Sequence, residues 1–219
     1  MGFRTVRTEN GFVISMGNTG LGKVPSFSTN RSTCGKLSKY CSKYCYMNYS
    51  SRMFKAVKAC QDTNTQLLQE WSQEKTVGEI DTFIKKYQFP LFRIHVNGDF
   101  LNRKELDSWI QIARLNLTTK FFAFTKQVHL FNLISIPDNL KIRFSVFFNM
   151  PETVKETILD KGFPIAYTDM NNIYQYRVCS KPCETCQVCY NSQENVFLPL
   201  HGKRAIRSFN KEKRENKHE

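Results

Sequence analysis

The sequence contains no apolar run long enough to cross a bilayer and no apolar segment near its start of the kind that directs export. Disulfides persist mainly in exported proteins, so the eight cysteines are not expected to pair with one another. We therefore expect a cytoplasmic protein without a membrane partner. Thiols that are closely grouped inside a cell are more often metal ligands than disulfide bridges.

Acidic residues are scarce at both ends of the chain. Residues 1–60 contain ten Lys and Arg and a single acid, Glu9, and residues 203–219 contain seven basic residues and three acids. The net charge of +13 is concentrated in these two segments. Such a charge favours an anionic partner, namely a nucleic acid, a nucleotide or a phosphorylated substrate. No RNA-binding or DNA-binding motif accompanies it.

A phosphate-binding loop is also missing, although one segment imitates its start. Residues 17–23 match the first seven positions of that motif, but Val24 stands where the Mg²⁺-binding Ser or Thr belongs. Pro25 and the residues after it argue against the helix whose N-terminus would hold the phosphates. We interpret the segment as a glycine-rich connection to the cysteines that follow.

Apolar periodicity predicts strands that alternate with helices. Strands are expected at 11–16, 91–96, 120–124, 141–148, 164–168 and 196–200, and helices at 47–71, 77–87, 102–113, 128–135 and 151–160. Asn102, with Glu105 three residues later, is typical of a helix N-cap. The pattern predicts a partial (β/α) barrel or an open, mostly parallel sheet, with its site at the C-terminal ends of the strands.

We expect a single α/β domain over residues 1–204. It carries an N-terminal cysteine loop at about 26–48 and a C-terminal cysteine cluster at 179–189. A basic, flexible tail is expected over residues 205–219.

The first cysteine run, defined as Cys34, Cys41 and Cys45, has no local fourth member. Cys60 lies roughly 20 Å along the predicted helix at 1.5 Å per residue, so it is expected to be a small buried apolar residue instead. Three thiolates without a fourth indicate either a [4Fe–4S] cluster with one open iron or a fourth ligand from elsewhere.

The second cysteine run consists of Cys179, Cys183, Cys186 and Cys189. Four cysteines within eleven residues are sufficient to hold one metal centre, either a [4Fe–4S] cluster or a tetrahedral zinc ion. The short separations favour iron–sulfur, because structural zinc more often divides its ligands into two distant pairs.

No catalytic acid, base or nucleophile can be assigned from the sequence. Lys126, Tyr167 and Asp169 are candidate cavity residues because they lie near predicted strand ends. His95 is interpreted as a core histidine, whereas His201 follows an apolar strand and is a weaker candidate for the site.

Several short motifs resemble the phage gene product 88 family over residues 11–204. They are Gly-Asn-x-x-Leu-Gly-Lys at 17–23, Thr33-Cys34, Cys-x3-Cys-Tyr at 41–46, Gly-Asp-Phe at 98–100 with Trp109, Cys-x2-Cys-x2-Cys-Tyr at 183–190 and Phe-Leu-Pro-Leu-His-Gly at 197–202. The resemblance implies a phage or prophage origin, and hence the host cytoplasm, more than it implies a reaction.

The predicted architecture is similar to that of radical S-adenosylmethionine (SAM) enzymes. In that family, three cysteines after the first strand hold a [4Fe–4S] cluster, and a Gly-Gly-Glu-like turn after the second strand holds the amino group of SAM. The resemblance implies that Cys34, Cys41 and Cys45 are cluster ligands and that Asn97, Gly98 and Asp99 form the SAM-facing turn. The family's Cys-x3-Cys-x2-Cys spacing, however, occurs at Cys179, Cys183 and Cys186 and not in the first run.

Three metal arrangements remain open at this point. The first places the SAM cluster at the first run and an auxiliary cluster at the second run. The next places the SAM cluster at the second run, with Cys189 completing the cluster at the first run, and the last has one centre shared by both runs. The leading hypothesis is a radical-SAM-like iron–sulfur enzyme that needs an electron donor. The alternative is a non-catalytic, metal-stabilised nucleic-acid-binding protein.

Overall fold

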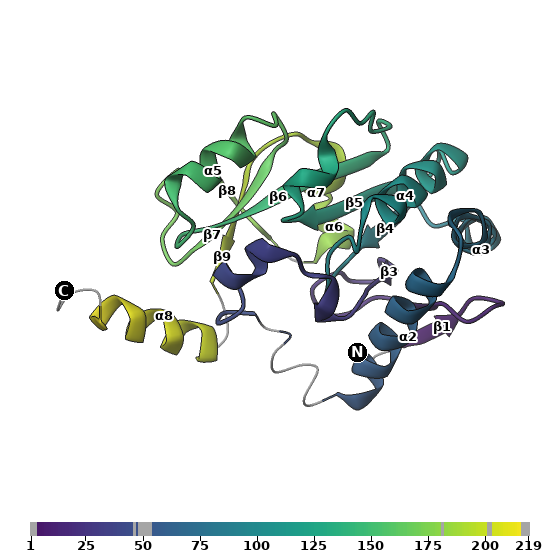
Figure 1. The fold of residues 1–219 in the computed structure, drawn as a ribbon, viewed down its shortest axis with the longest axis horizontal. Coiled ribbons are helices and arrows are strands. Elements are labelled where there is room, and N and C mark those ends of the chain that lie inside the picture. Colours follow the sequence, from purple (N-terminus) through teal and green to yellow (C-terminus); the bar gives the residue numbers. More distant parts are fainter. Residues whose placement is uncertain (1–3, 46, 48–53, 181, 201–202, 216–219) are drawn as a thin grey trace.

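The chain folds around one open, nine-stranded sheet, shown by the computed structural model for residues 4–45, 47, 54–180, 182–200 and 203–215 (Figure 1). In spatial order the strands are β1 (Thr5–Arg7), β2 (Val13–Ser15), β3 (Ser26–Phe27), β4 (Leu91–Ile94), β5 (Lys120–Thr125), β6 (Leu140–Phe147), β7 (Ile165–Asp169), β9 (Val196–Pro199) and β8 (Arg177–Val178). Strands β3 to β9 pair in parallel, as does β8 with β9. The α/β prediction is confirmed as a largely parallel open sheet, and the sheet does not close into a barrel.

The parallel part of the sheet begins one strand later than the sequence indicated. The predicted strand at 11–16 is β2, which pairs antiparallel with both β1 and β3. The connections on both sides of β2 are short, and short connections join antiparallel strands, whereas parallel strands need a longer crossover. The first parallel strand is therefore the two-residue β3, which no periodic pattern marked.

Helices cover one face of the sheet. They are α2 (Lys55–Glu70), α3 (Gln73–Tyr87), α4 (Arg103–Leu115) and α5 (Glu152–Leu159), with the short η3 (Val128–Phe131). Their apolar residues share one core with Phe92, Phe121 and Phe144 of the strands, all fully buried. Burying a side chain of this size contributes about 1.5–3 kcal/mol. The segment 128–135 gives only η3 in place of the predicted helix, and Leu133 adopts a positive φ of 48°.

The N-cap prediction for α4 is confirmed. The Asn102 side chain accepts a hydrogen bond from the backbone N–H of Glu105 at 3.0 Å, and Glu105 Oε2 accepts one from the N–H of Leu101 at 2.7 Å. One of the N–H groups left unpaired at the helix start and the N–H that precedes the cap are thereby satisfied. The turn that precedes α4 is consequently fixed against the end of β4.

The second cysteine run lies on the opposite face. It forms α6 (Cys183–Cys186) and α7 (Val188–Asn191) between β8 and β9, and α7 contacts β5 and β6. Tyr190 packs with Leu91 and Phe122, whose side chains alternate with those of the helical core. Successive strand residues point to opposite faces, so this apolar cluster is separate from the main core.

The C-terminal segment, expected as a basic, flexible tail over residues 205–219, contains a helix. Helix α8 (Lys203–Glu215) projects beyond the body of the molecule in Figure 1. Its start is anchored by Ala205 and Phe209, which are buried beside Tyr44 and Leu200. Among the described residues, no helix is both long and apolar enough to span a membrane.

Candidate metal and cofactor site

The first cysteine run occupies the loop that follows β3. Two 3₁₀ helices, η1 (Arg31–Thr33) and η2 (Lys36–Tyr40), flank Cys34, and η2 separates it from Cys41. The thiols of Cys34, Cys41 and Cys45 interact electrostatically with one another and with the ammonium group of Lys126. The loop after β3, the turn after β4 and the start of the connection after β5 therefore meet at one edge of the sheet. The cysteine loop was expected after the strand at 11–16 and follows β3 instead.

Asp99 holds these three segments together. Its Oδ1 accepts hydrogen bonds from the Thr125 hydroxyl at 2.6 Å and the Phe100 N–H at 2.9 Å, and its Oδ2 accepts one from the Lys126 N–H at 2.9 Å. The Asp99 N–H in turn donates to the Thr33 hydroxyl at 2.9 Å, directly before Cys34. Asp99 is fully buried, so its carboxylate anchors the cysteine loop from beneath.

Two glycines permit close packing below the first run. Gly98 has φ +77°, and a Cβ at this position would lie 2.0 Å from the Thr29 hydroxyl oxygen. A Cβ on Gly35 would lie 2.1 Å from Oε1 of Gln127. The Gln127 amide donates to the carbonyls of Thr33 and Phe100, each at 3.0 Å. These contacts fix the backbone on the N-terminal side of Cys34.

Of the three predicted SAM-facing residues, Asn97 is the one that lines the large cavity described below. Its amide donates to the Thr29 carbonyl at 3.1 Å and to Oε1 of Gln61 at 2.9 Å. Gly98 and Asp99 are engaged in the packing of the loop. A cofactor-binding role for the turn stays a prediction, and its most direct candidate is Asn97.

Burial and charge oppose each other at the first run. Burial raises the pKa of Cys34 to about 11, although the positive charge of Lys126 acts in the opposite direction. Burial lowers the pKa of Lys126, but Asp99 and the three thiolates outweigh it, and the pKa lies above its ordinary value. Lys126 therefore remains charged beside the first run, where it favours the anionic, metal-binding form of Cys34 and Cys41.

The glycine-rich segment 17–23 has a structural role next to the second run. The carbonyls of Gly20 and Leu21 accept hydrogen bonds from the N–H groups of Cys183 and Glu184 at 3.1 and 3.0 Å. The Glu184 carboxylate accepts one from the Lys23 N–H at 2.9 Å, and a Cβ on Gly22 would lie 2.4 Å from this carboxylate. The segment therefore supports α6, consistent with the rejection of a phosphate-binding loop.

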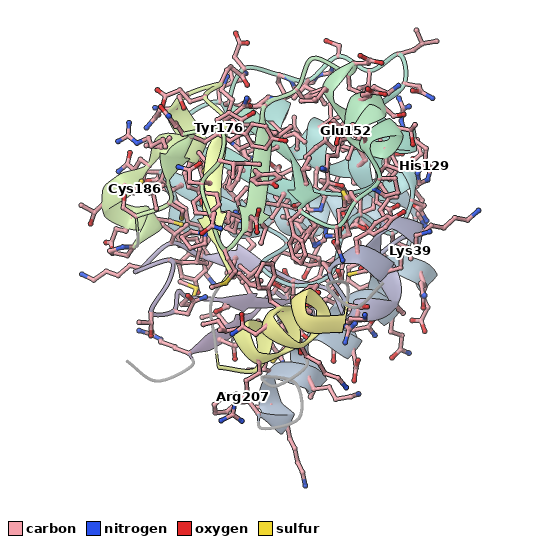
Figure 2. The ribbon with its side chains drawn as sticks, turned by 90° about the vertical axis from the view of Figure 1, so that its left-hand side faces the viewer. Lys39, His129, Glu152, Tyr176, Cys186 and Arg207 are labelled. Carbon is pink, nitrogen blue, oxygen red and sulfur yellow. The ribbon has the colours of Figure 1, made fainter. Side chains whose placement is uncertain are left out.

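The thiols of the second run lie near buried arginines. Cys189 interacts electrostatically with Cys179 and Cys183, and with Arg143 and Arg93. In Figure 2, Cys186 and Lys39, which lies on η2 of the first run, stand on opposite sides of the molecule. This separation favours two centres over a single shared one.

Within the described residues, no group of three or more His, Cys, Asp or Glu side chains is already arranged around a metal position. The metal-ligand predictions for both runs therefore stay predictions. The donor chemistry nevertheless fits a thiolate-bound metal, because each run combines several cysteine thiols with a nearby cation. Such a cation stabilises thiolates before and after a metal binds.

A cavity of about 970 Å³ lies between α2, which lines it with Val57 and Asn64, and strand residues such as Arg93 that point away from the main core. It extends from Asn97 and Arg93 to Cys179 and Cys183. Its size is at the upper end of small-molecule sites, roughly 300–1,000 Å³. Cys60 also lines it and is only partly buried, so the expectation of a buried apolar residue was wrong.

The other candidate residues are distributed through the core and surface. The Tyr167 hydroxyl donates to Asp169 at 3.2 Å, and neither residue lines the large cavity. His95 is buried just after β4, with Nε2 2.9 Å from Oε1 of Glu105. His201 lies outside the described residues.

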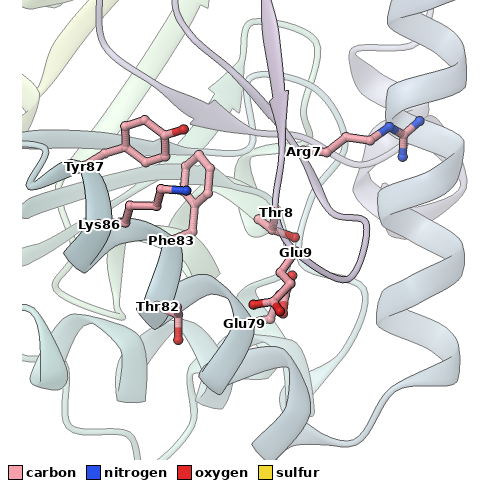
Figure 3. A pocket seen from close by; sticks show the side chains of 8 residues that line it. All are labelled: Arg7, Thr8, Glu9, Glu79, Thr82, Phe83, Lys86 and Tyr87. Atoms are coloured by element: carbon pink, nitrogen blue, oxygen red, sulfur yellow. The ribbon is translucent and has the colours of Figure 1, made fainter.

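A smaller pocket of about 280 Å³ separates the β1–β2 hairpin from α3 (Figure 3). Glu79 of α3 accepts hydrogen bonds from the backbone and side-chain nitrogens of Asn10 at 2.6 and 2.7 Å. The carboxylate is thus used to attach the hairpin to the helix.

Residues 5–169 match the family described as gene product 88. The chain belongs to the gene product 88 family. It is 26% identical to the Gene 88 protein of Mycobacterium phage L5 and 25% identical to that of Mycobacterium phage D29, and each alignment covers 76% of this chain and 81% of the relative. The phage relatives support a bacteriophage origin. No solved structure matches the chain.

Proposed function

We propose that this member of the gene product 88 family is an iron–sulfur enzyme of the radical-SAM type. In this proposal the first cysteine run holds a [4Fe–4S] cluster with one open iron, and the second run holds an auxiliary centre. The observation that carries the proposal is the convergence of Cys34, Cys41 and Cys45 with Lys126 at the C-terminal edge of a parallel sheet. This edge is where α/β enzymes place their reactive groups.

The sheet supports the same interpretation. Strands β3, β4, β5, β6, β7 and β9 are neighbours in the order of the chain, as in a (β/α) barrel strip. The cysteine loop follows the first of these strands, and the Asn97–Asp99 turn follows the second. The proposal treats this sequential, open strip as the architectural counterpart of a radical-SAM domain.

The residues of the chain would prepare the site in three ways. The Asp99 network would hold the cysteine loop rigid, Lys126 would offset the negative charge of the thiolates, and Asn97 would present its polar edge to a cofactor in the cavity. The apolar lining, which includes Leu21, Phe124 and Leu198, would limit access of water. When bound, the cluster would supply an electron to SAM and so begin radical chemistry on a substrate.

Anaerobic purification of the full chain tests this proposal. We expect a brown protein that contains iron and acid-labile sulfide, and an electron paramagnetic resonance signal of the reduced protein that changes when SAM is added. Under strong reductant the protein should release 5′-deoxyadenosine. Cys45→Ala should abolish the SAM response, whereas Lys36→Ala, an exposed change on η2 of the same loop, should preserve it. A colourless protein with zinc alone, or a spectrum that SAM leaves unchanged, would contradict the proposal.

The second candidate is a metal-stabilised protein that binds nucleic acid without catalysis. The basic helix α8, from which Arg207 projects in Figure 2, is the observation that favours it. Binding through such a surface should weaken steeply with salt. Tight, salt-dependent binding of a nucleic acid by a protein that contains only zinc would favour this candidate over the enzyme.

A further inference from the structure

Two arginines are buried on the face of the sheet that the second cysteine run covers. Arg143 of β6 is completely buried, and Arg93 of β4 is 6% exposed. Both lie against Phe122 of the intervening strand, with their guanidinium carbons 5.5 and 4.4 Å from its ring centre. A buried cation is costly unless a negative charge compensates it.

These arginines donate their hydrogen bonds to neutral backbone carbonyls and a hydroxyl group, and to no carboxylate. Arg143 donates to the carbonyls of Cys189 at 2.8 Å, Ser192 at 2.9 Å and Glu194 at 3.2 Å, and to the Ser192 hydroxyl at 3.3 Å. Arg93 donates to the carbonyls of Ile94 and His95 at 3.1 and 3.2 Å. None of the ion pairs formed by the described residues includes either arginine.

The Cys189 thiol interacts electrostatically with both cations, and Arg143 also interacts with the Glu194 carboxylate. Cys183 and Cys189 pack on the apolar cluster that contains Phe122, the ring against which both guanidinium groups lie. Arg93 also lines the large cavity together with Cys179 and Cys183. A centre with four thiolates has a net negative charge, because the thiolates outweigh the charge of a zinc ion or of a [4Fe–4S] core.

We propose that Arg93 and Arg143 are the counter-charges of an anionic metal–thiolate centre held by Cys179, Cys183, Cys186 and Cys189. This inference rests on the auxiliary centre of the proposed function and assigns its charge balance to two positions outside the cysteine run. Arg143 also ties the end of α7 to the sheet through its carbonyl contacts. Arg93 contacts no backbone of the cysteine segment in its described hydrogen bonds, so it is the cleaner position to test.

The experiment uses the full chain with Cys41→Ala and Cys45→Ala, so that bound metal reports on the second run. In this background Arg93→Met removes the charge but retains an unbranched apolar stem against Phe122 and Phe124. We measure the rate at which bound iron or zinc is lost to excess chelator under anaerobic conditions. Arg93→Met should lose metal about tenfold faster, a typical effect of losing a supporting contact around a metal. Lys120→Gln, which removes an exposed charge that contacts Asn191 of α7, should leave the rate unchanged.

The stability of the metal-free chain separates charge balance from packing. We expect metal-free Arg93→Met to be at least as stable as its metal-free parent, because the buried charge without a counter-ion has been removed. An equal loss of stability with and without metal, or an unchanged rate of metal loss, would overturn the inference. The rate measurement decides the question even if the metal-free chain does not fold.

The two proposals can fail separately. If the Cys41→Ala, Cys45→Ala chain binds no metal, the charge-balance inference is overturned, and iron at the first run is measured in a Cys186→Ala, Cys189→Ala chain. If the second run binds metal and Arg93→Met accelerates its loss, the inference stands whether or not the protein responds to SAM.

Discussion

The two cysteine runs contain the same ligand type in different surroundings. The first lies at the edge of the sheet on a polar network centred on Asp99, with Lys126 as its cation. The second lies across a face of the sheet, between the glycine-rich segment and an apolar cluster that includes Tyr190, with two buried arginines. The first run is therefore attached through side-chain hydrogen bonds to its loop, whereas the backbone of the second run is itself packed against the sheet.

The strongest test of this comparison removes one thiol from each run. Cys189→Ala should lower the thermal midpoint of the metal-loaded protein by more than about 10 °C, because α7 packs on the sheet and metal-binding free energy at such a site is also folding free energy. Cys45→Ala should remove iron but shift the midpoint by less than about 3 °C, because the Asp99 network remains. Thermal unfolding under anaerobic conditions measures both. Equal losses would indicate two structural centres and argue against an enzyme.

A backbone change sharpens the role of the packing below the first run. Gly98→Ala should cost roughly 2–4 kcal/mol, because φ is positive there and the new Cβ would overlap the Thr29 hydroxyl. The matched control is Gly78→Ala in α3, where a Cβ meets nothing within 4 Å. This control should gain roughly 0.5–1 kcal/mol. Denaturant unfolding distinguishes the two, and a Gly98→Ala protein of unchanged stability would show that the loop is loosely packed.

A smaller effect is expected from replacing Gln127, whose side chain holds the loop of the first run through two hydrogen bonds. Gln127→Ala leaves the carbonyls of Thr33 and Phe100 without this donor, and should cost roughly 1–2 kcal/mol. Gln111→Ala provides the control, because Gln111 is an exposed amide on α4 that should change stability by less than about 0.5 kcal/mol. Chemical denaturation is the measurement. If both substitutions have the same effect, Gln127 does not anchor the loop.

The smallest expected effect depends on pH and tests whether the charge of Asp62 helps to hold the first run in place. Hydrogen bonds from Lys58 and Asn30 hold the pKa of Asp62 below its ordinary value of 3.8, although burial opposes them. A lowered pKa stabilises the fold above 3.8, and this contribution is lost as the pH falls through the folded-state pKa.

Asp62→Asn should therefore cost less than about 0.5 kcal/mol at neutral pH, because Asp62 is partly exposed, and nothing in strong acid. Urea unfolding at neutral pH and at a pH well below 3.8 measures the difference. The hydrogen bonds from Arg143 to backbone carbonyls do not titrate in this range. Acid should therefore weaken the contact between Asp62 and Asn30 near the first run and leave the contacts of Arg143 with the second run unchanged. A cost that is the same at both pH values would contradict the role of the Asp62 charge.

Much of the fold could be predicted from periodicity. The strands that became β4 to β7 and β9, and the cap of α4 by Asn102, follow directly from apolar spacing and turn chemistry. Strands β3 and β8 have only two residues each, too few for any period, and their pairing depends on partners distant in sequence. The hairpin position of β2 and the helical form of α8 were likewise not evident.

The two cysteine runs could be recognised from the sequence, whereas the residues that support them could not. Lys126 was marked only as a cavity candidate near a strand end, and its position beside the first run emerges from the structure. The burial of Asp99 and the contacts of Gln127 depend on three loops that meet, which local sequence does not encode. Arg93 and Arg143 were not marked by the sequence patterns. Each is a single arginine within an otherwise apolar strand, and this interruption of a buried strand is the signal that would have marked them.

The two-residue strand β8 determines the side of the sheet on which the second run can lie. From β3 to β7 the chain always advances in one direction, with its helices on one face. After β7 the chain skips one position to form β8 at the edge of the sheet and then returns to form β9 between them. The crossover from β8 to β9, which carries Cys183, Cys186 and Cys189, runs over the opposite face. A crossover that moves backward along the sheet on the opposite face has the same hand as one that moves forward on the first face, and the right-handed form is strongly preferred. Without β8, the same segment would need a left-handed crossover to reach that face.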